Sequence, residues 1–186
     1  MYNCTNIYLS AATPENLRTV FEFVERGLEQ IGFKKNLDFQ IKVDSNKNPT
    51  ELSFFIKFGE DQENQKIKQQ KVLYLKPGEI PYNPDLLVID EAAAIPFNVL
   101  KPMVFSTKAT TIISSTIHGY EGTGRSLSIK LIEGLRRNGG SSNDNQTLRI
   151  LEEMNMEIPI RYNVRDPVED WLNTLLCLDC SDVTPL

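Results

Sequence analysis

One stretch decides the fold of this chain: Leu86-Leu-Val-Ile-Asp90-Glu91-Ala-Ala-Ala-Ile-Pro96. Four apolar residues lead into two adjacent carboxylates, and small residues and a proline follow. A run this short, apolar on both faces, is typical of a strand in the middle of a parallel sheet that is covered on both sides. Open α/β sheets bind their ligands at the carboxyl ends of such strands. We therefore expect Asp90 and Glu91 to lie at a ligand-binding edge.

A hydrophobic strand followed by Asp-Glu is also the Walker B pattern of P-loop nucleoside triphosphatases. In that pattern the Asp holds the Mg²⁺ of the nucleotide, usually through water, and the Glu orients or deprotonates the attacking water. The alternative is a strand that ends in two solvated acids at a turn. Asp90 and Glu91 alone do not decide between the two.

A strand and a capped helix are predicted at the start of the chain. Ile7-Tyr-Leu9 is typical of a short strand, Thr13 of a helix N-cap and Pro14 of a first helical position. Apolar residues then recur every three or four positions, and Gly32 is expected to end the helix. This order is half of a βαβ unit.

Three further strands and a loop are predicted before Leu86. Alternating polar and apolar residues at 37–43 and 52–58 predict a hairpin or two neighbouring strands. Residues 59–71 are almost wholly polar and predict a flexible surface loop. Residues 72–75 predict another short strand.

The second half continues the alternation. A short helix is predicted after Pro96, and the β-branched run 110–116 predicts a second buried strand. A helix is expected at 126–137, a flexible loop at 138–147, and a last helix that Asp166 caps. Alternating strands and helices predict a three-layer α/β fold.

The composition limits the class of protein to which this chain can belong. The chain has 186 residues, 40% hydrophobic and 24% charged, which fits one large or two small globular domains. Its net charge of −5 excludes a basic footprint over the whole domain, so nucleic acid would need a local patch. The cluster Lys66, Lys68 and Lys71 is typical of a solvated face. No apolar run is long enough for a membrane span and no signal peptide is visible, which favours the cytosol or nucleus.

A glycine-rich loop stands at Gly119-Tyr-Glu-Gly122-Thr-Gly124-Arg125-Ser126. It nearly matches the Walker A loop that cradles phosphates, with arginine in place of lysine. A Walker A loop normally precedes its Walker B strand, and a guanidinium does not simply replace the lysine. We therefore favour the sensor position of helicase-like ATPases, in which Ser114-Ser115-Thr116 respond to the nucleotide and Arg125 touches phosphate of ATP or RNA. A loop chosen only for its turn geometry is the alternative.

His118 and Arg161 are two further candidate site residues. His118 is the only histidine and has no acidic residue at an obvious spacing, so a hydrogen bond within the loop is favoured over catalysis. Arg161 follows an extended apolar segment and is either a structural arginine or an arginine that contacts ATP.

Several motifs together resemble one family. They are Leu87-Val-Ile-Asp-Glu-Ala-Ala-Ala-Ile-Pro96, Ser115-Thr-Ile-His-Gly-Tyr-Glu-Gly-Thr-Gly-Arg-Ser-Leu-Ser128, Ile160-Arg-Tyr162 and Asp166-Pro-Val-Glu-Asp-Trp-Leu-Asn173. In this order they resemble the helicase module of the RNA cytidine acetyltransferases, over nearly the whole chain. The resemblance implies a RecA-like ATPase joined to an acetyltransferase domain that uses acetyl-CoA. Such enzymes form N4-acetylcytidine in rRNA and tRNA, in the nucleus and nucleolus of eukaryotes and otherwise in the cytoplasm.

The resemblance also assigns residues. It implies that 1–186 is part of a RecA-like domain whose Walker A strand and loop lie upstream, because no G-x-G-K-S run occurs here. The resemblance makes Asp90 and Glu91 the Mg²⁺ and water carboxylates and Arg161 an ATP contact. The sensor assignment adds Arg125 and Thr116 as ATP-binding residues. The loop that couples ATP to RNA comprises Ser115, His118, Gly119, Gly122 and Gly124. The family more usually has Asn at His118 and an acid at Ile158.

Expectations about behaviour follow. The isolated chain should bind ATP weakly and hydrolyse it negligibly. An apolar edge beside the Leu86 strand, left by the upstream strand, should favour self-association. The alternatives are a non-catalytic RecA-like module that docks RNA or assembly partners, and a P-loop ATPase of unrelated purpose.

Overall fold

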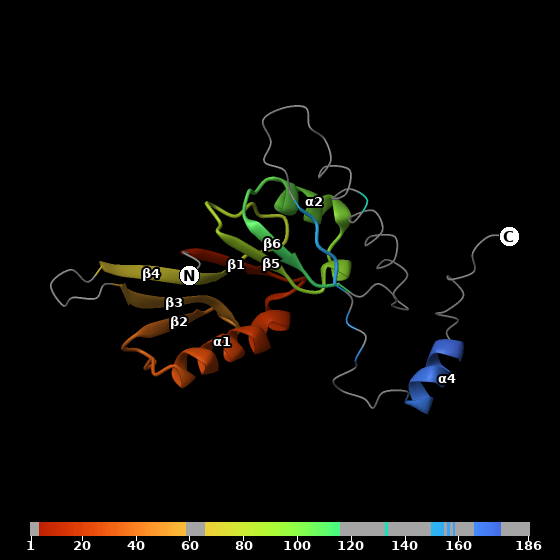
Figure 1. The fold of residues 1–186 in the computed structure, drawn as a ribbon, viewed down its shortest axis with the longest axis horizontal. Helices are drawn as coiled ribbons and strands as arrows, with labels where there is room; N and C mark the ends of the chain where they lie inside the picture. The colour runs from red at the N-terminus through yellow and green to blue at the C-terminus, as the bar shows by residue number, and fades with distance from the viewer. Residues whose placement is uncertain are drawn as a thin grey trace. The chain divides into compact units, whose positions relative to one another are not determined.

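The computed structural model describes residues 4–58, 66–115, 133, 150–154, 156, 158 and 166–175. The chain divides into two compact units, Met1–Ser115 and Thr116–Leu186. The first unit contains a six-stranded sheet, and the described part of the second contains helix α4 (Pro167–Leu175) (Figure 1). Among the described residues, no helix is long and apolar enough to cross a membrane.

The sheet mixes parallel and antiparallel strands. Its strands are β1 (Asn6–Ser10), β2 (Phe39–Val43), β3 (Pro49–Phe58), β4 (Lys66–Tyr74), β5 (Leu86–Ile89) and β6 (Thr110–Ile113). Their order in space is β2-β3-β4-β1-β5-β6. Strands β4, β1, β5 and β6 are parallel, whereas β3 is antiparallel to both β2 and β4. The predicted α/β class is confirmed, with an antiparallel wing of β2, β3 and β4 added to a parallel half.

Strand β5 lies inside the sheet, as its apolar run predicts. Leu86 pairs with Ile7 of β1 on one side and with Thr110 of β6 on the other. The expectation of an open edge beside β5 is therefore wrong, because both of its edges are hydrogen-bonded. Among the described strands the outer positions belong to β2 and β6, so self-association beside β5 loses its structural basis.

The helix after β1 begins with a turn of 3-10 helix, η1 (Pro14–Leu17), and continues as α1 (Arg18–Gln30). Thr13 precedes it as predicted, but its hydroxyl contacts Oδ1 of Asn16 at 3.0 Å and caps no backbone group of the described residues. Gly32 ends the helix with a φ of 95°. The N–H groups of Gly32 and Phe33 donate to the carbonyls of Glu29 and Leu28, the pattern of a Schellman cap.

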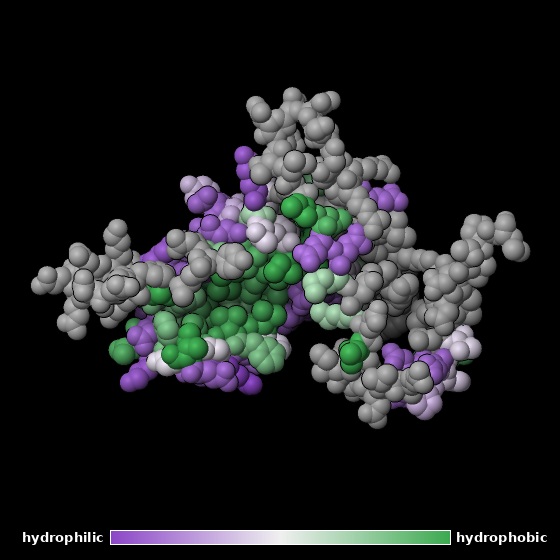
Figure 2. Space-filling model, in the orientation of Figure 1, coloured by the Kyte–Doolittle hydropathy of each residue, from purple (hydrophilic) through white to green (hydrophobic). Residues whose placement is uncertain are grey.

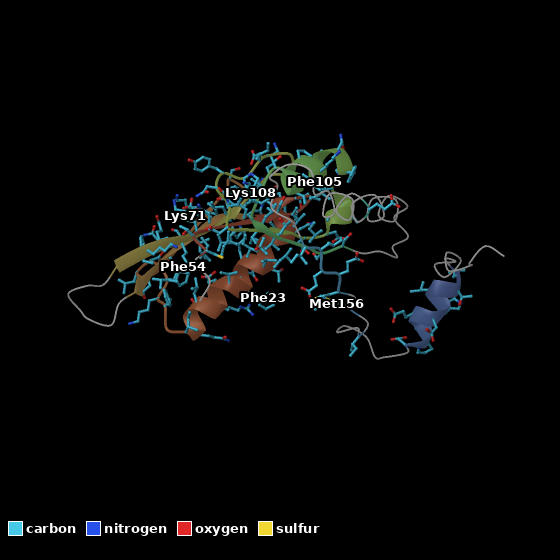
Figure 3. All side chains as sticks on the ribbon, turned by 45° about the horizontal axis from the view of Figure 1, so that its top comes forward. Phe23, Phe54, Lys71, Phe105, Lys108 and Met156 are labelled. Carbon is cyan, nitrogen blue, oxygen red and sulfur yellow. The ribbon has the colours of Figure 1, made fainter. Side chains whose placement is uncertain are left out.

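Helices cover both faces of the sheet. On one face α1 buries Phe21 and Leu28 against a cluster from β1 to β4, and Figure 2 shows hydrophobic side chains gathered between α1 and these strands. The cluster contains Leu9, Ala11, Leu17, Phe39, Leu52, Phe54 and Val72. On the other face lies α2 (Phe97–Phe105), which follows the short 3-10 turn η2 (Ala92–Ala94) (Figures 1 and 3). Val88 packs toward the α1 cluster, so its buried neighbours Leu87 and Ile89 face the α2 side.

Strand β4 corrects the predicted loop at 59–71. It begins at Lys66 and pairs with β3 from Phe58↔Lys66 to Glu51↔Leu73. The sequence did not predict this part of the strand because it is rich in lysine and glutamine. These residues are compatible with a strand here, since backbone pairing with β3 fixes the conformation. Gln70 is buried, and its Nε2 donates to the carbonyl of Cys4. Residues 59–65 and 138–147 lie outside the described residues.

The remaining predicted elements agree where they are described. The hairpin of β2 and β3, the helix after Pro96 and a strand from Thr110 are confirmed. The strand from Thr110 is shorter than predicted, and the prediction that it is buried is wrong, because β6 lies at the edge of the sheet and Ile112 is exposed. Asp166 caps α4, because its Oδ1 accepts from the N–H of Val168 at 2.9 Å. The predicted helix at 126–137 lies outside the described residues apart from Glu133.

Candidate functional site

The two carboxylates stand at the carboxyl edge of the parallel half. Asp90 follows β5, and its N–H donates to the carbonyl of Ser10 on β1 at 2.8 Å. On the other side, Ser114 follows β6 and its N–H donates to the carbonyl of Ile89 at 2.9 Å. The end of β5 is thus bonded to both neighbouring strands, at the edge where open α/β sheets bind ligands.

The connections to the helices make this edge a topological switch point. From β1 the chain passes to α1 on one face, and from β5 it passes to α2 on the other. Ligands of open sheets bind in the crevice where such connections diverge. The loop after β1 begins with the small residues Ala11 and Ala12.

Ser114 orients the carboxylate of Asp90. Its hydroxyl donates to Oδ1 of Asp90 at 2.5 Å, and the N–H of Glu91 approaches the same Oδ1 at 3.1 Å and Oγ of Ser114 at 3.3 Å. Within residues 4–58 and 66–115, no hydrogen bond reaches Oδ2 of Asp90. Among the described residues, Ser114 and Glu91 therefore fix one carboxylate oxygen of Asp90, and none of them bonds the other.

Glu91 has a left-handed backbone. Its φ is 49° and its ψ is 52°, a conformation that costs a non-glycine residue about 1–2 kcal/mol. The structure maintains it because the N–H of Glu91 is bonded to Asp90 and Ser114, and the N–H of Ala92 donates to the carbonyl of Ser114 at 2.9 Å. The turn leaves the side chain of Glu91 exposed to solvent, where it is free to reach a water molecule or a ligand.

Ser10 is a site residue that the sequence did not reveal. It is fully buried at the end of β1, and its hydroxyl has no hydrogen-bond partner among the residues that the structure describes. Only the register of β1 with β5 places it beside Asp90, and that register leaves no local signal in the sequence. Ser114 was predicted within a sensor run, but its bond to Asp90 also depends on strand pairing.

The donor atoms at this edge fit a magnesium ion. Mg²⁺ prefers oxygen ligands, keeps several waters, and is commonly held by one or two carboxylates together with substrate phosphates. The described part of the chain contains no group of three acidic, histidine or cysteine side chains that would hold a metal alone. A single carboxylate that is oriented through one oxygen, with no bond from a described residue to the other, fits the water-mediated role expected of Asp90.

The structure covers only part of the predicted site. Asp90 and Glu91 are placed together, and Ser115 follows Ser114 half-buried. Seven predicted residues lie outside the described residues and stay predictions: Thr116, His118, Gly119, Gly122, Gly124, Arg125 and Arg161. Ile158, at the position where the family more usually has an acid, is exposed.

Comparisons with known proteins identify the family. The model for "RNA cytidine acetyltransferase NAT10/TcmA, helicase domain" matches residues 1–179. RNA cytidine acetyltransferases of Caenorhabditis elegans, Dictyostelium discoideum and Homo sapiens are 37%, 38% and 36% identical over 189, 187 and 198 residues. These matches cover 97%, 96% and 98% of this chain but only 17%, 17% and 18% of the relatives.

Solved structures give a weaker likeness. The large terminase of a thermophilic bacteriophage is 16% identical with a TM-score of 0.45, over 72% of this chain and 32% of that chain. At this TM-score the likeness carries no argument. The family match rests on sequence: this chain belongs to the RNA cytidine acetyltransferase family, matches its helicase domain, and spans less than a fifth of the length of its curated relatives.

Proposed function

We propose that this chain is part of a RecA-like ATPase domain and supplies the metal and water carboxylates of its ATP site. The observation that carries the proposal is Asp90, which Ser114 and the backbone of Glu91 hold by one oxygen. Asp90 would hold Mg²⁺ through water on its other oxygen, and the exposed Glu91 would orient the attacking water.

The other predicted site residues complete this proposal. Arg161, Arg125 and Thr116 would contact ATP. The loop of Ser115, His118, Gly119, Gly122 and Gly124 would link the state of the nucleotide to RNA. A Walker A strand and loop from upstream would cradle the phosphates, since no G-x-G-K-S run occurs in these 186 residues.

In the whole protein, ATP hydrolysis would drive RNA remodelling that presents a cytidine for acetylation. The names of the relatives support an RNA substrate and acetyl transfer to cytidine. We propose N4-acetylcytidine in rRNA and tRNA as the product, acetyl-CoA as the donor in a separate domain, and the nucleus and nucleolus as the location in a eukaryote. The isolated chain should hydrolyse ATP negligibly.

Nucleotide binding with and without Mg²⁺ tests the proposal. A fluorescent ATP analogue should bind the chain weakly, and more tightly with Mg²⁺ than with EDTA. Asp90→Asn should remove this difference, because the neutral amide is a poor partner for hydrated Mg²⁺. Glu22→Gln, which changes an exposed acid on α1, is the matched control and should leave the difference intact.

Two outcomes would contradict the proposal. If Asp90→Asn keeps the Mg²⁺ effect, Asp90 does not hold the metal, and the non-catalytic docking module becomes the better interpretation. If the isolated chain turns over ATP and Glu91→Gln abolishes that turnover, the phosphate cradle is present here, and Gly119 to Ser126 becomes the phosphate loop.

A further inference from the structure

The antiparallel wing has a face that no described helix covers. In β3, Leu52 and Phe54 point into the cluster beneath α1, so the alternate residue Phe55 points to the opposite face. Figure 3 shows Lys71 and Phe54 on opposite sides of the sheet. The strand pairings place further side chains on the Phe55 side. We name this surface the open sheet face and define it by Gln40, Lys42, Phe55, Gln69 and Lys71.

An exposed aromatic ring lies at the centre of this face. Phe55 is 47% exposed although it belongs to the middle strand of the wing. Gln69 lies directly across from Phe55 on β4, and Lys71 is two residues further along that strand. Cross-strand and diagonal neighbours of this kind lie within reach of one ligand. The ring is thus flanked by an amide and an ammonium group.

Two described carboxylates adjoin the open sheet face. Glu51 forms an ion pair with Lys42 at 2.8 Å. Asp38, whose carbonyl accepts from the N–H of Phe55 at 3.3 Å, accepts from the N–H of Lys34 through its Oδ2 at 2.8 Å. Lys71 forms no ion pair with any described residue. The solvent side of α1 differs, because Arg18, Arg26 and acidic residues alternate there. Lys71 is therefore the group of this face that would attract a negatively charged ligand.

A second exposed aromatic residue lies beside this face. Tyr8 on β1 pairs with Leu73 of β4, and its hydroxyl donates to the carbonyl of Tyr82 at 3.0 Å. Tyr82 is 85% exposed, whereas the preceding Pro81 is buried and anchors the loop. The hydrogen bond places the backbone of Tyr82 against Tyr8 of β1, the strand beside β4, and the Tyr82 side chain is exposed to solvent.

We propose that the open sheet face, together with Tyr82, binds single-stranded RNA. The proposal rests on the proposed function, which makes RNA the substrate of the parent protein. Proteins that bind single strands on a sheet stack bases on exposed aromatic rings and attract phosphates with basic side chains. Phe55 would stack a base, Gln69 and Gln40 would hydrogen-bond base edges, and Lys71 would contact a phosphate.

Fluorescence anisotropy with a labelled 12-nucleotide oligouridylate tests the proposal on the 186-residue chain. Phe55→Ala should weaken binding about tenfold, as expected for the loss of one stacked base, and Phe55→Tyr should restore it. Lys71→Gln should flatten the dependence of log K on log salt by about 0.7, the contribution of one phosphate contact to a single strand. Phe23→Ala is the matched control, since Phe23 on α1 is 65% exposed and should not affect binding.

The proposal is overturned if the wild-type chain does not bind the oligonucleotide, or if Phe55→Ala binds it as tightly as wild type. It is also overturned if Phe23→Ala weakens binding as much as Phe55→Ala. Failure here is distinguishable from failure of the ATP site, because Asp90→Asn should leave RNA binding unchanged and Phe55→Ala should leave the Mg²⁺ effect on nucleotide binding unchanged.

Discussion

The strands of the parallel half and those of the antiparallel wing of the first unit have different sequence patterns. Strand β5 of the parallel half is four consecutive apolar residues between two neighbouring strands, and functional groups follow at its carboxyl end. Strand β4 of the wing is rich in lysine and glutamine, and it is held by pairing with β3. Because β5 is buried on two faces, it appears in the sequence as a continuous apolar run. Because β4 is buried on one face, its sequence shows little that predicts a strand.

The difference also separates two kinds of site. At the carboxyl edge, backbone hydrogen bonds join the ends of β1, β5 and β6, and the Ser114 hydroxyl and the Glu91 N–H fix the Asp90 carboxylate. On the open sheet face the candidate ligands are side chains that project from paired strands, with little to restrain them. A compact, charged ligand group suits the first arrangement, and an extended flexible chain suits the second.

The largest expected effect tests whether the wing depends on α1. Phe21 is buried in the cluster that joins α1 to β1, β2, β3 and β4, so Phe21→Ala should lower the free energy of unfolding by about 3–5 kcal/mol. Phe23→Ala on the exposed side of the same helix should change it by less than about 0.5 kcal/mol. Urea denaturation followed by circular dichroism measures both. Equal effects would show that the ring of Phe21 is not packed as described.

Leu87→Ala tests the packing of the parallel half in the same way. Leu87 is fully buried on the α2 side of β5, and its loss should cost about 2–5 kcal/mol. If both halves fold as one unit, near- and far-ultraviolet circular dichroism should report one coincident urea transition in Leu87→Ala and in Phe21→Ala. Two separated transitions, of which Phe21→Ala shifts one and Leu87→Ala the other, would contradict the description of Met1–Ser115 as one compact unit.

The sequence predicts local features better than strand pairing for a physical reason. An apolar run at Leu86–Ile89, the pattern of α1 with Gly32 at its end, and the Asx cap at Asp166 are local signals, and the structure contains all three features. Strand pairing is not local: the strand at Lys66, the position of β6 next to β5, and the contact of Ser114 with Asp90 each depend on residues far away in the chain. The predicted edge beside β5 failed for that reason.

The next largest effect on stability is expected in the turn between β2 and β3. Oδ1 of Asp44 accepts from the N–H groups of Asn46 and Asn48 at 2.8 Å, and Nδ2 of the buried Asn48 donates to Oε1 of Glu15 at 3.1 Å. Asn48→Ala would leave the side-chain partners of Asn48 unsatisfied and should cost about 1–3 kcal/mol in urea denaturation. Asn46→Ala, at an exposed position of the same turn, is the control and should have little effect. Similar losses from both variants would mean that the link to Glu15 is unimportant.

Glycine substitution at two left-handed residues compares the site with the wing directly. Glu91 has a φ of 49° and Lys47, in the turn between β2 and β3, has a φ of 63°. Either residue changed to glycine should gain roughly 0.5 kcal/mol, because relief of about 1–2 kcal/mol of strain exceeds the backbone entropy cost of about 0.5–1 kcal/mol. Thermal unfolding measures the gain, and ATP hydrolysis by the full-length parent should be lost only in Glu91→Gly. A parent that remains active with Glu91→Gly would remove Glu91 from the proposed mechanism.

The smallest expected effect concerns pH and the amino end of β5. The N–H groups of Asn6 and Thr5 donate to Oδ2 of Asp85 and lower the pKa of this carboxyl below its ordinary value of 3.8. A carboxyl with a lowered folded-state pKa contributes stability above its unfolded pKa, and this stability is lost as the pH falls through the folded-state value. Asp85→Asn should therefore destabilise the chain slightly at pH 6, and the difference from wild type should shrink as the pH falls below 3.8. Urea denaturation at pH 6 and pH 3 measures this difference; a gap of equal size at both values would mean that the amide hydrogen bonds do not depend on the charge of Asp85.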